Sequence, residues 1–546
     1  METPLSRVAS KPLAVRGRFG PQSPGAAGRV LSPLATDLGL GGPIARERFA
    51  TRWSDTPALT ELAAAKRAPL APELGDALVE YHRRLGASPA SLGSLERLIR
   101  GDAVAAVAGQ QPAPLGGPLY SLHKTASTVG IAAEITARTG MPCVPMFWMH
   151  GEDSDFAEIR AIAIADPTLA LHELELPASA HRDGGLVGAI PLPPLEALET
   201  AALAHWSALP GQSQITALLR PPHARARDLG EAYSALMLAL FAEQGLVVID
   251  PRLPAFRAAA RPIIGRYLAR AEDLAAAVQR AGDVLEARAG QRPLAGPALE
   301  SFVFRIEDGV RHKVTPAQAR ALGPGADLSP SVALRPAVQD GVFPTVAMAC
   351  GAAEASYLAQ LREVFAGVEV KPACPVLRLS VTWLPAAGVE LMEAAQASAE
   401  ELVFAADALL KRYAESQTPT AVRADLERAQ SQVNEGLARL AESSRRVDPS
   451  FPQVVESARG KVDFQFARLR EGLAGKIRHQ LERQHPEWVR LRYYLQPGDK
   501  LQERRLATLE PIARRGLVTV GELCRLAAEH ARRLADGVHE HLVVEL

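Results

Sequence analysis

Short apolar runs alternate with longer helical patterns over most of the chain. Each run is bounded by turn residues, which is typical of the buried strands of a parallel sheet. The four runs are Val104–Ala108, Cys143–Met149, Leu246–Ile249 and Thr345–Ala349. A helical pattern from about Leu119 to Arg138 separates the first two runs, and Gly140 and Pro142 follow it in the order expected at a helix end. This pattern predicts a βαβ unit within a mostly α/β fold.

Less regular stretches separate the later strands. Residues 175–225 are rich in Pro, His and Gly and have few periodic signals, which indicates an insertion between two halves of the sheet. The elements predicted after it are helices at about 226–244 and 255–288 and a hairpin of Phe302–Ile306 with Val310–Val314. Glu307-Asp308-Gly309 supplies a strong turn signal for that hairpin. We expect the second half of the sheet to resume near Leu328.

The pattern changes to long amphipathic helices after Leu384. Apolar residues recur at seven-residue intervals at Leu426, Val433, Leu440 and Val447, with Val422, Ala429 and Gly436 in a weaker second seam. Prolines follow, and a second helical pattern then contains Val462, Phe466, Leu469, Leu473, Ile477 and Leu481. Two such helices joined by a short turn predict an antiparallel coiled-coil hairpin. The weak second seam indicates that the hairpin needs another surface, from this chain or from a second copy.

These patterns suggest four segments. They are a partly disordered N-terminal segment at 1–55, a core at 56–385 with insertions near 175–225 and 260–325, a coiled-coil hairpin at 386–485 and a C-terminal helical segment at 486–546. A length of 546 residues exceeds what one hydrophobic core usually supports, so several units are expected.

The composition argues against several classes of protein. Lys plus Arg and Asp plus Glu are equal at 61 each, so the chain lacks the basic excess of a nucleic-acid-binding protein. It has no apolar run long enough for a membrane span and no signal-peptide pattern, which predicts a cytoplasmic protein. The four cysteines lie far apart in sequence and are expected to be buried free thiols.

The strongest candidate site is the loop Gly109–Gly117 between the first strand and its helix. A helix N-terminus offers free N–H groups and a positive dipole end to an anionic or nucleotide-like ligand. Glycines permit close approach of the backbone, and amide side chains recognise polar groups. The candidate binding residues here are Gln110, Gln111, Gly116, Gly117, Tyr120 and Lys124. The alternative is a tight turn that uses glycine for its geometry alone.

A second candidate is the acidic stretch that follows the strand Cys143–Met149. His150, Glu152, Asp153 and Asp155 lie where ligands bind in open parallel sheets, beyond the carboxyl end of a strand. The three carboxylates are candidate catalytic groups, able to hold an amine or Mg²⁺ or to act as a general base, and His150 is a candidate ligand or base. The alternative is a solvated turn that caps a helix beginning near Phe156.

A third candidate lies near the last strand. Arg335 is suited to clamp a carboxylate or phosphate with two hydrogen bonds. The remaining candidate binding residues are Gln339, Asp340, Glu354, Tyr357 and Gln360, of which the last three share helical spacing. Taken together, the three regions predict that Gln110, Glu152 and Arg335 face one cavity. No metal-binding set is assigned.

Eight motifs follow one another along the chain. They are Gly109-Gln-Gln-Pro112, Gly116-Gly-Pro-Leu-Tyr120, Pro145-Met-Phe-Trp148, Glu152-Asp153-x-Asp155-Phe156, Gly245-Leu-Val-Val-Ile-Asp250, Leu334-Arg-Pro336 with Gln339-Asp340, Glu354-Ala-Ser-Tyr357 and Lys500-Leu-Gln-Glu-Arg504. In this order they resemble the bacillithiol-biosynthesis cysteine ligase family (BshC) over roughly residues 60–515. The resemblance implies a Rossmann-like core and a C-terminal coiled coil that often dimerises. The chain departs from the family in having Ser154 where a histidine is usual.

The resemblance also implies a reaction, the joining of L-cysteine to the amine of glucosaminyl malate. Forming an amide from a free carboxylate at neutral pH needs activation, so ATP is the expected co-substrate, and a homodimer through the C-terminal helices is expected. Two alternatives remain at this stage. One is a nucleotidyl transferase acting on another small molecule, and the other is a catalytically degenerate coiled-coil interaction protein, which the Ser154 departure would explain.

Overall fold

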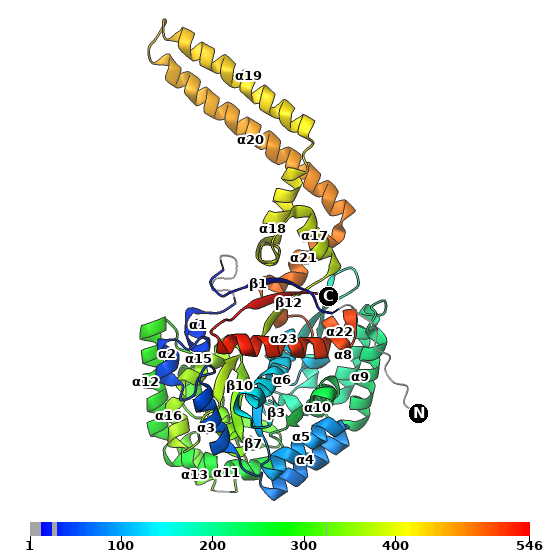
Figure 1. Cartoon of the computed structure of the whole chain (residues 1–546), viewed down its shortest axis with the longest axis vertical. Coiled ribbons are helices and arrows are strands. Elements are labelled where there is room, and N and C mark those ends of the chain that lie inside the picture. Colours follow the sequence, from blue (N-terminus) through cyan, green and yellow to red (C-terminus); the bar gives the residue numbers. More distant parts are fainter. Residues whose placement is uncertain (1–11, 24–29, 324) are drawn as a thin grey trace. The chain divides into compact units, whose positions relative to one another are not determined.

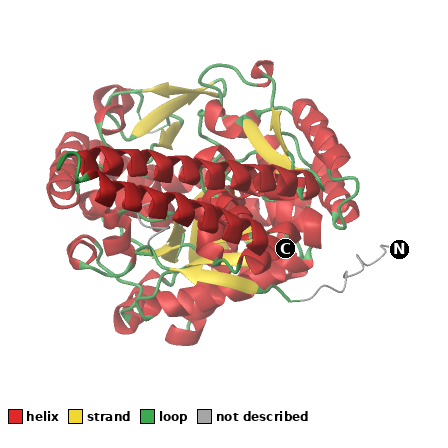
Figure 2. Cartoon of the chain, turned by 90° about the horizontal axis from the view of Figure 1, so that it is seen from above, coloured by secondary structure: helices red, strands yellow, loops and turns green. Residues whose placement is uncertain are grey.

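The computed structural model describes residues 12–23, 30–323 and 325–546, without the side chains of 221–223. The chain forms two compact units, one of Met1–Leu384 with Pro497–Leu546 and the other of Pro385–Gln496. The first unit contains the sheets and most of the shorter helices, and the second contains the long helices α19 (Thr420–Ser444) and α20 (Phe451–Gln484) (Figure 1). Helices make up most of both units (Figure 2).

A parallel sheet of five strands lies at the centre of the first unit, in the order β11-β10-β2-β3-β6. Its strands are β2 (Val104–Gln110), β3 (Cys143–Met149), β6 (Val247–Ile249), β10 (Thr345–Cys350) and β11 (Cys374–Leu377). The four predicted strands are confirmed. The fifth, β11, was missed because it is a four-residue edge strand with Pro375 inside it, and proline weakens a strand signal.

Both faces of this sheet are buried, as the continuous apolar runs predicted. In β2, Val104 and Ala106 pack into one core and Ala105 and Val107 into the other, because successive side chains point to opposite faces. The first face is covered by α1 (Pro33–Gly39), α3 (Thr56–Lys66), α6 (Leu119–Thr139) and α23 (Val518–Ala535). The second is covered by α4 (Pro72–Leu85), α5 (Pro89–Arg100), α11 (Pro254–Ala269), α12 (Ala271–Ala289), α14 (Arg335–Val342) and α16 (Arg362–Gly367).

Helix α6 ends as predicted, with Gly140 in the left-handed conformation at φ 70°. It runs close beside α23 from the far end of the chain (Figure 1). At Gly130, a Cβ atom would lie 2.6 Å from the backbone of Ala527 and Ala528. A glycine is therefore required where these two helices approach most closely.

The predicted hairpin is confirmed as β7 (Val303–Glu307) and β8 (Val310–Lys313). The expectation that the main sheet resumes near Leu328 was wrong. β9 (Leu328–Pro330) pairs antiparallel with β7 and extends the hairpin into a separate sheet. A short apolar strand does not reveal its partner, because pairing depends on contacts far away in sequence. A two-stranded sheet of β4 (Ala161–Ala165) and β5 (Leu171–Glu175) was not predicted.

Two helical predictions also need correction. Much of the insertion at 175–225 is helical, as α8 (Leu192–His205) and α9 (Gln212–Arg225), because the prolines of α8 lie in its first turn, where proline is tolerated. The helix predicted at 255–288 is divided at Arg270 into α11 and α12. The helix predicted at about 226–244 is α10 (Leu229–Leu240) followed by a short 3₁₀ turn.

The two ends of the chain meet in one sheet, which neither terminal prediction anticipated. β1 (Val15–Phe19) pairs antiparallel with β13 (His541–Glu545), and β13 pairs parallel with β12 (Ser380–Leu384). The N-terminal segment therefore contains ordered elements, including α2 (Pro43–Arg48), while residues 1–11 and 24–29 lie outside the described residues. The C-terminal segment is not only helical, since its last strand is buried in the first unit.

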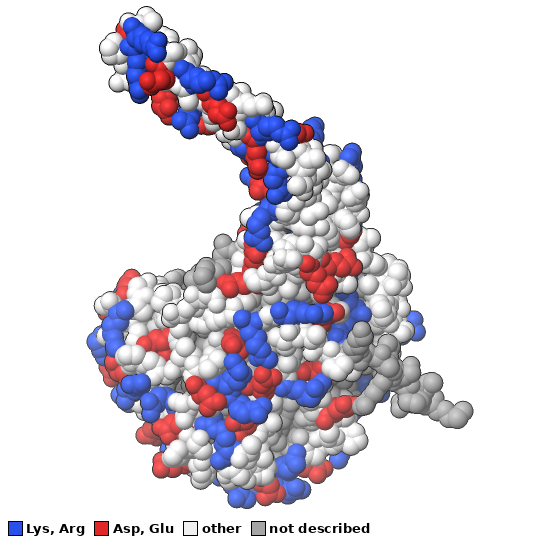
Figure 3. Space-filling view, turned by 45° about the horizontal axis from the view of Figure 1, so that its top comes forward, with Lys and Arg blue, Asp and Glu red and all other residues white. Residues whose placement is uncertain are grey.

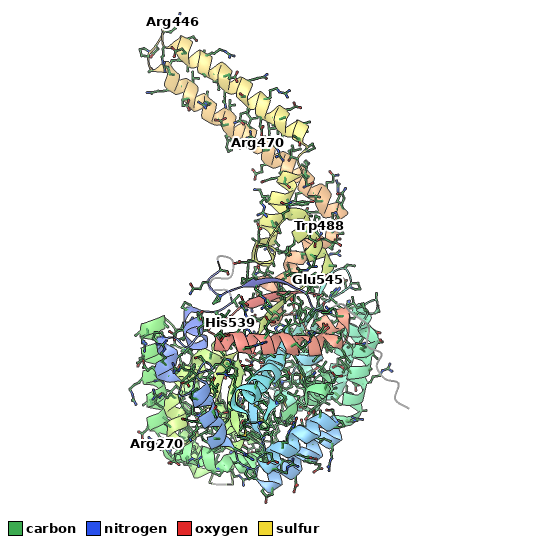
Figure 4. All side chains as sticks on the ribbon, viewed as in Figure 1. Arg270, Arg446, Arg470, Trp488, His539 and Glu545 are labelled. Carbon is green, nitrogen blue, oxygen red and sulfur yellow. The ribbon has the colours of Figure 1, made fainter. Side chains whose placement is uncertain are left out.

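The second unit consists of helices. They are α17 (Ala386–Ala395), α18 (Ala399–Ser416), α19 (Thr420–Ser444), α20 (Phe451–Gln484) and α21 (Pro486–Leu495). α19 and α20 pack along each other as the predicted hairpin, and Arg446 marks the turn between them (Figure 4). No residue of α19 is fully buried, and in α20 only Val455 and Ala474 are.

Candidate functional site

A cavity of about 670 Å³ lies at the carboxyl ends of the central strands. Gln110 ends β2, His150 follows β3 and Gly351 follows β10, and all three line it. The carboxyl ends of parallel strands share one edge of the sheet, so loops far apart in sequence converge there. The prediction that Gln110, Glu152 and Arg335 face one cavity is confirmed. The full set of predicted residues that line it is Gln110, Gln111, Tyr120, Lys124, His150, Glu152, Asp153, Arg335, Glu354 and Tyr357.

Lys124 is buried and fully occupied by protein acceptors. Its ammonium lies 2.7 Å from Glu354 and donates to the carbonyl of Gly109 and to Oε1 of Gln110 at 3.0 and 3.1 Å. Glu354 lies in the first turn of α15 (Ala352–Gln360) and also accepts a hydrogen bond from the backbone N–H of Gly351. Three acceptors use the three donors of an ammonium, so Lys124 orders the cavity wall before any anion arrives.

Glu152 is a buried carboxylate with two protein partners. One oxygen accepts from Arg257 at 2.9 Å, and the other accepts from the hydroxyl of Ser329 at 2.8 Å. Burial raises the pKa of Glu152, although the charge of Arg257 and the Ser329 hydrogen bond oppose that shift. The carboxylate is therefore positioned by α11 and β9, two elements that lie far from it in sequence.

Asp153 lies beside Glu152 and is more open. It accepts hydrogen bonds from Nε2 of Gln111 at 2.8 Å and from the backbone N–H of Ser154 at 2.7 Å. The guanidinium of Arg311, which belongs to β8, lies 3.4 Å from its other side. Asp153 thus links the β2 loop, the β3 loop and the hairpin.

Arg335 is a buried cation in the same cavity. Its guanidinium donates to the hydroxyl of Tyr357 at 2.8 Å and to Oε1 of Gln339 at 3.2 Å. Among the described residues, no carboxylate forms an ion pair with it. A buried guanidinium with neutral partners remains suited to an anionic group of a ligand, because a carboxylate matches its paired N–H donors.

His150 has an imidazole without a protein partner. Its Nε2 atom is buried, and neither ring nitrogen has a hydrogen-bond partner among the described residues. Burial lowers the pKa of His150 well below its usual range, and the charges of Arg335, Lys124 and Arg311 lower it further. The ring is therefore neutral at physiological pH, with a free lone pair.

Asp155 does not belong to the cavity. It is the N-cap of α7 (Phe156–Ile159) and accepts a hydrogen bond from the backbone N–H of Glu158 at 3.2 Å. Its placement matches the alternative interpretation of the acidic stretch, a cap on the following helix. The assignment of Asp155 as a catalytic candidate is corrected on this ground.

Gly116 and Gly117 also lie outside the cavity lining. Both have positive φ, and a Cβ atom at Gly116 would lie 2.9 Å from the side chain of Thr508. The backbone N–H of Leu119 donates to the carbonyl of Leu506 at 2.7 Å, so the chain itself occupies this N–H at the start of α6. The two glycines permit that close packing, and the alternative of a tight structural turn describes them better than the predicted anion cradle.

Gln339 and Asp340 are buried away from the lining. Asp340 accepts hydrogen bonds from the hydroxyl of Thr345 at 2.6 Å and from the backbone N–H of Ala373 at 2.7 Å. Thr345 begins β10, so Asp340 lies toward the amino ends of the strands, opposite the cavity. Gln339 supports Arg335 from behind and donates to Asp340.

Gln360 is a structural residue at the other end of α15. Its amide accepts from the N–H of Leu294 at 2.8 Å and donates to the carbonyls of Leu294 and Val278, each at 3.0 Å. It therefore joins α12 to the following loop. Gln360 belongs to the same helix as Glu354 and Tyr357, but it lies six positions beyond Glu354 and outside the cavity.

Several lining residues were missed because they come from distant segments. Arg311 and Lys313 belong to β8, Arg378 follows β11, and Arg504 comes from the C-terminal segment. Glu503 holds Arg378 through two hydrogen bonds and accepts a third from His123 at 3.0 Å. The motif Lys500–Arg504 indicated that the C-terminal segment contributes to function, but it did not indicate that this segment reaches the cavity.

Three of the four cysteines are buried as expected, and Cys143 is partly exposed. All four thiols are free, and burial raises the pKa of each of them, to about 12 for Cys374 and Cys524. Acidic and basic side chains are interspersed on the face shown in Figure 3. Within the described ranges, no helix has the length and apolar character needed to cross a membrane, and no group of three or more metal-binding side chains is found.

These features define a Rossmann-like α/β protein with a polar small-molecule cavity at the carboxyl edge of its sheet and a separate coiled-coil unit. Comparison with family models extends this description. Residues 32–322 and 318–379 match the bacillithiol biosynthesis BshC N-terminal Rossmann-like domain, and residues 381–533 match the C-terminal coiled-coil domain of the same family. The chain belongs to the BshC family of bacillithiol biosynthesis.

Curated relatives carry one common name, "Putative cysteine ligase BshC". The relative from Koribacter versatilis is 30% identical over 466 residues, which cover 82% of this chain and 86% of that protein. The one from Solibacter usitatus is 26% identical and covers 78% and 82%, and the one from Salinibacter ruber is 25% identical and covers 89% and 92%. The similarity therefore extends over most of this chain and most of each relative.

Proposed function

We propose that this protein joins L-cysteine to the amine of glucosaminyl malate, forming the amide bond of bacillithiol. Its family and the names of its relatives support a ligase of this pathway. The observation that carries the proposal is the convergence of Gln110, Glu152 and Arg335 on one cavity of about 670 Å³. That volume lies in the range typical of small-molecule sites, so the cavity has room for a polar sugar conjugate.

The charges around the cavity suggest how the two substrates divide it. Arg335 has no carboxylate partner among the described residues and is proposed to bind a malate carboxylate. Asp153 and Glu158 line the same cavity and supply negative charge for the ammonium of cysteine. Oppositely charged groups would then orient the substrates, which lowers the entropy cost of bringing amine and carboxyl together.

ATP is proposed as the co-substrate that activates the carboxyl group. The residues first predicted to hold its phosphates do not fit that role, since Leu506 occupies the Leu119 N–H at the start of α6 and Glu354 neutralises Lys124. Another cation of the cavity fits better. Arg504 lines it without a carboxylate partner among the described residues, and Arg335 is assigned to malate. Bound there, ATP would supply the chemical activation that a free carboxylate lacks.

A reconstitution experiment tests the proposal. The purified chain is incubated with cysteine, glucosaminyl malate and ATP, and thiol products are measured by mass spectrometry, with each component omitted in turn. We expect a product with the mass of bacillithiol that requires all three. A folded protein that makes no such product, and that binds neither cysteine nor glucosaminyl malate in calorimetry, would contradict the proposal. Cells lacking the gene should lose bacillithiol and accumulate its cysteine-free precursor.

We also propose that the chain works as a cytoplasmic homodimer formed through its C-terminal helices. Large apolar side chains remain exposed along α19 and α20, and these include Val433, Leu440, Phe464 and Leu469. Exposed apolar stripes on paired helices are suited to a second helical surface. Light scattering of the purified chain should give twice the monomer mass, and replacing Leu440 and Leu469 with Glu should give a monomer. A wild-type monomer at micromolar concentration would exclude the dimer.

A further inference from the structure

The imidazole of His150 is an unusual feature of the cavity wall, because it is enclosed but unbonded. Its Nε2–Cδ2 edge lies against Gly109, where a Cβ atom would come within 2.5 Å of Nε2 and 3.2 Å of Cδ2. The ring lines the cavity, and neither nitrogen has a protein partner among the described residues. Nε2 is closed off by Gly109, whereas Nδ1 is not fully buried, so Nδ1 is the nitrogen that a ligand in the cavity can reach.

Three cations act on this ring. They are Arg335 from α14, Lys124 from α6 and Arg311 from β8. Glu354 neutralises Lys124, and Asp153 lies 3.4 Å from Arg311, so these two carboxylates of the cavity are directed to other partners. Such surroundings disfavour the imidazolium before substrate binds. The ring therefore offers a hydrogen-bond acceptor to whatever enters the cavity.

Two carboxylates of the cavity are committed to the fold, whereas Asp153 and Glu158 are assigned above to the ammonium of cysteine. Glu152 is held by Arg257 and Ser329, and Glu354 by Lys124 and the N-terminus of α15. Each carboxylate makes hydrogen bonds that fix neighbouring elements, and protonating it would weaken them. His150 has no such structural bond to lose. It can gain and release a proton without disturbing the wall.

We propose that His150 is the catalytic base of the amide-forming step, which rests on the function proposed above. As the substrate nitrogen bonds to the activated carbonyl carbon of cysteine, the bond from that carbon to its anionic leaving group breaks. The proton displaced from nitrogen passes to Nδ1 of His150, whose Nε2 carries the ring hydrogen. The proton then leaves with solvent, which restores the neutral ring. An acceptor of low basicity suffices, because the nitrogen becomes strongly acidic as the new bond forms.

Steady-state kinetics of His150→Ala tests this role, with His312→Ala as the matched control. His312 is exposed on β8 and does not line the cavity. We expect kcat of His150→Ala to fall on the order of 10²- to 10⁴-fold. KM for both substrates should change little, and added imidazole should restore part of the rate. His312→Ala should match the wild type. A His150→Ala kcat within about twofold of the wild-type value, or an effect confined to KM, would overturn the assignment.

The wild-type pH profile provides a test that does not depend on the folding of a variant. The kcat/KM profile, which reports groups of the free enzyme, should have an acid limb below pH 6.5, since burial and then the three cations favour the neutral ring. His150→Gln should lose that limb. A wild-type limb above pH 6.5, or an unchanged limb in His150→Gln, would contradict the proposal. If the wild type makes no product from cysteine and glucosaminyl malate, the proposed ligase function is wrong. If the wild type makes product and His150→Ala keeps the wild-type kcat, only the role of His150 is wrong.

Discussion

The ammonium of Lys124 lies 2.7 Å from a carboxylate oxygen of Glu354, and this buried ion pair joins α6 to α15 beside the cavity. Both side chains are enclosed, with 7% and 14% of their surface exposed. Losing one partner leaves the other charge buried without compensation, which is costly in a low-dielectric setting. The pair therefore holds together two elements that each contribute residues to the site.

Lys124→Met should lower the free energy of unfolding by about 3 kcal/mol, because Glu354 would keep a buried charge without its partner. The measurement is urea unfolding at neutral pH. Adding Glu354→Gln to Lys124→Met should recover part of that loss. Lys411→Met serves as the control, since Lys411 and Glu471 form an exposed pair, and its effect should stay within about 0.5 kcal/mol. If the double variant loses as much unfolding free energy as the two single variants together, Lys124 and Glu354 do not stabilise each other.

Arg335→Gln should weaken binding of the carboxylate substrate more than it slows the chemical step. Loss of a paired guanidinium contact predicts an increase in KM for glucosaminyl malate of roughly 10- to 100-fold, with a smaller effect on kcat. Tyr357→Phe, which removes one hydrogen-bond acceptor from Arg335, should raise KM only severalfold. The control is Arg305→Gln, whose partner Glu307 lies on the same exposed strand. An unchanged KM for Arg335→Gln would remove Arg335 from the substrate site.

Gly109→Ala should reduce activity while the chain stays folded. The new Cβ atom would lie 2.5 Å from Nε2 of His150, so the imidazole must shift from its position. We expect at least a tenfold loss of kcat, measured beside a thermal melt. Gly93 lies in α5 with open space around it, and Gly93→Ala should raise stability by about 0.5–1 kcal/mol without changing kcat. Full activity of Gly109→Ala would show that His150 tolerates displacement.

Glu231 should contribute stability that depends on pH. Burial alone raises its pKa, but hydrogen bonds from Arg84 and Arg227 outweigh burial and lower the pKa from 4.5 to about 2. A depressed folded-state pKa gives stability that is complete above pH 4.5 and lost as pH falls toward 2. Glu231→Gln should therefore lower the free energy of unfolding by about 2 kcal/mol at pH 7. The loss should become smaller as the pH falls from 4.5 toward 2.

The control for that experiment is Glu427→Gln, because Glu427 is exposed on α19. The free energy of unfolding of Glu427→Gln should differ little from that of the wild type, and the difference should not depend on pH. Unfolding by urea at several pH values between 2 and 7 measures both variants. If the free energy of unfolding of Glu231→Gln differs from that of the wild type by the same amount at pH 7 and at pH 2, the ion pairs of Glu231 make no pH-dependent contribution to stability.

Local patterns predicted the elements whose sequence signature is local. β2, β3, β6 and β10 were found because strands buried on both faces need continuous apolar runs. The end of α6 was found because Gly140 adopts a backbone conformation that few other residues tolerate. The convergence of Gln110, Glu152 and Arg335 followed from the rule that ligands bind beyond the carboxyl ends of parallel strands.

Local patterns could not show which of several neighbouring polar residues belong to the site and which have a structural role. Asp153 and Asp155 lie two positions apart, yet one lines the cavity and the other caps α7. Glu354 and Gln360 lie on one helix, and only Glu354 reaches the site. Each outcome depends on which distant group meets the side chain, and local spacing carries no record of that partner.

The amino-acid sequence alone determined the class of fold, the parallel strands, the helical hairpin and the edge of the sheet where chemistry gathers, because periodicity and turn residues act over a few positions. Only the tertiary structure decided that Leu506 covers the start of α6, that Arg504 and Arg311 reach the cavity, and that His150 has no partner. These facts depend on contacts between segments hundreds of residues apart, and such contacts form only when the whole chain packs.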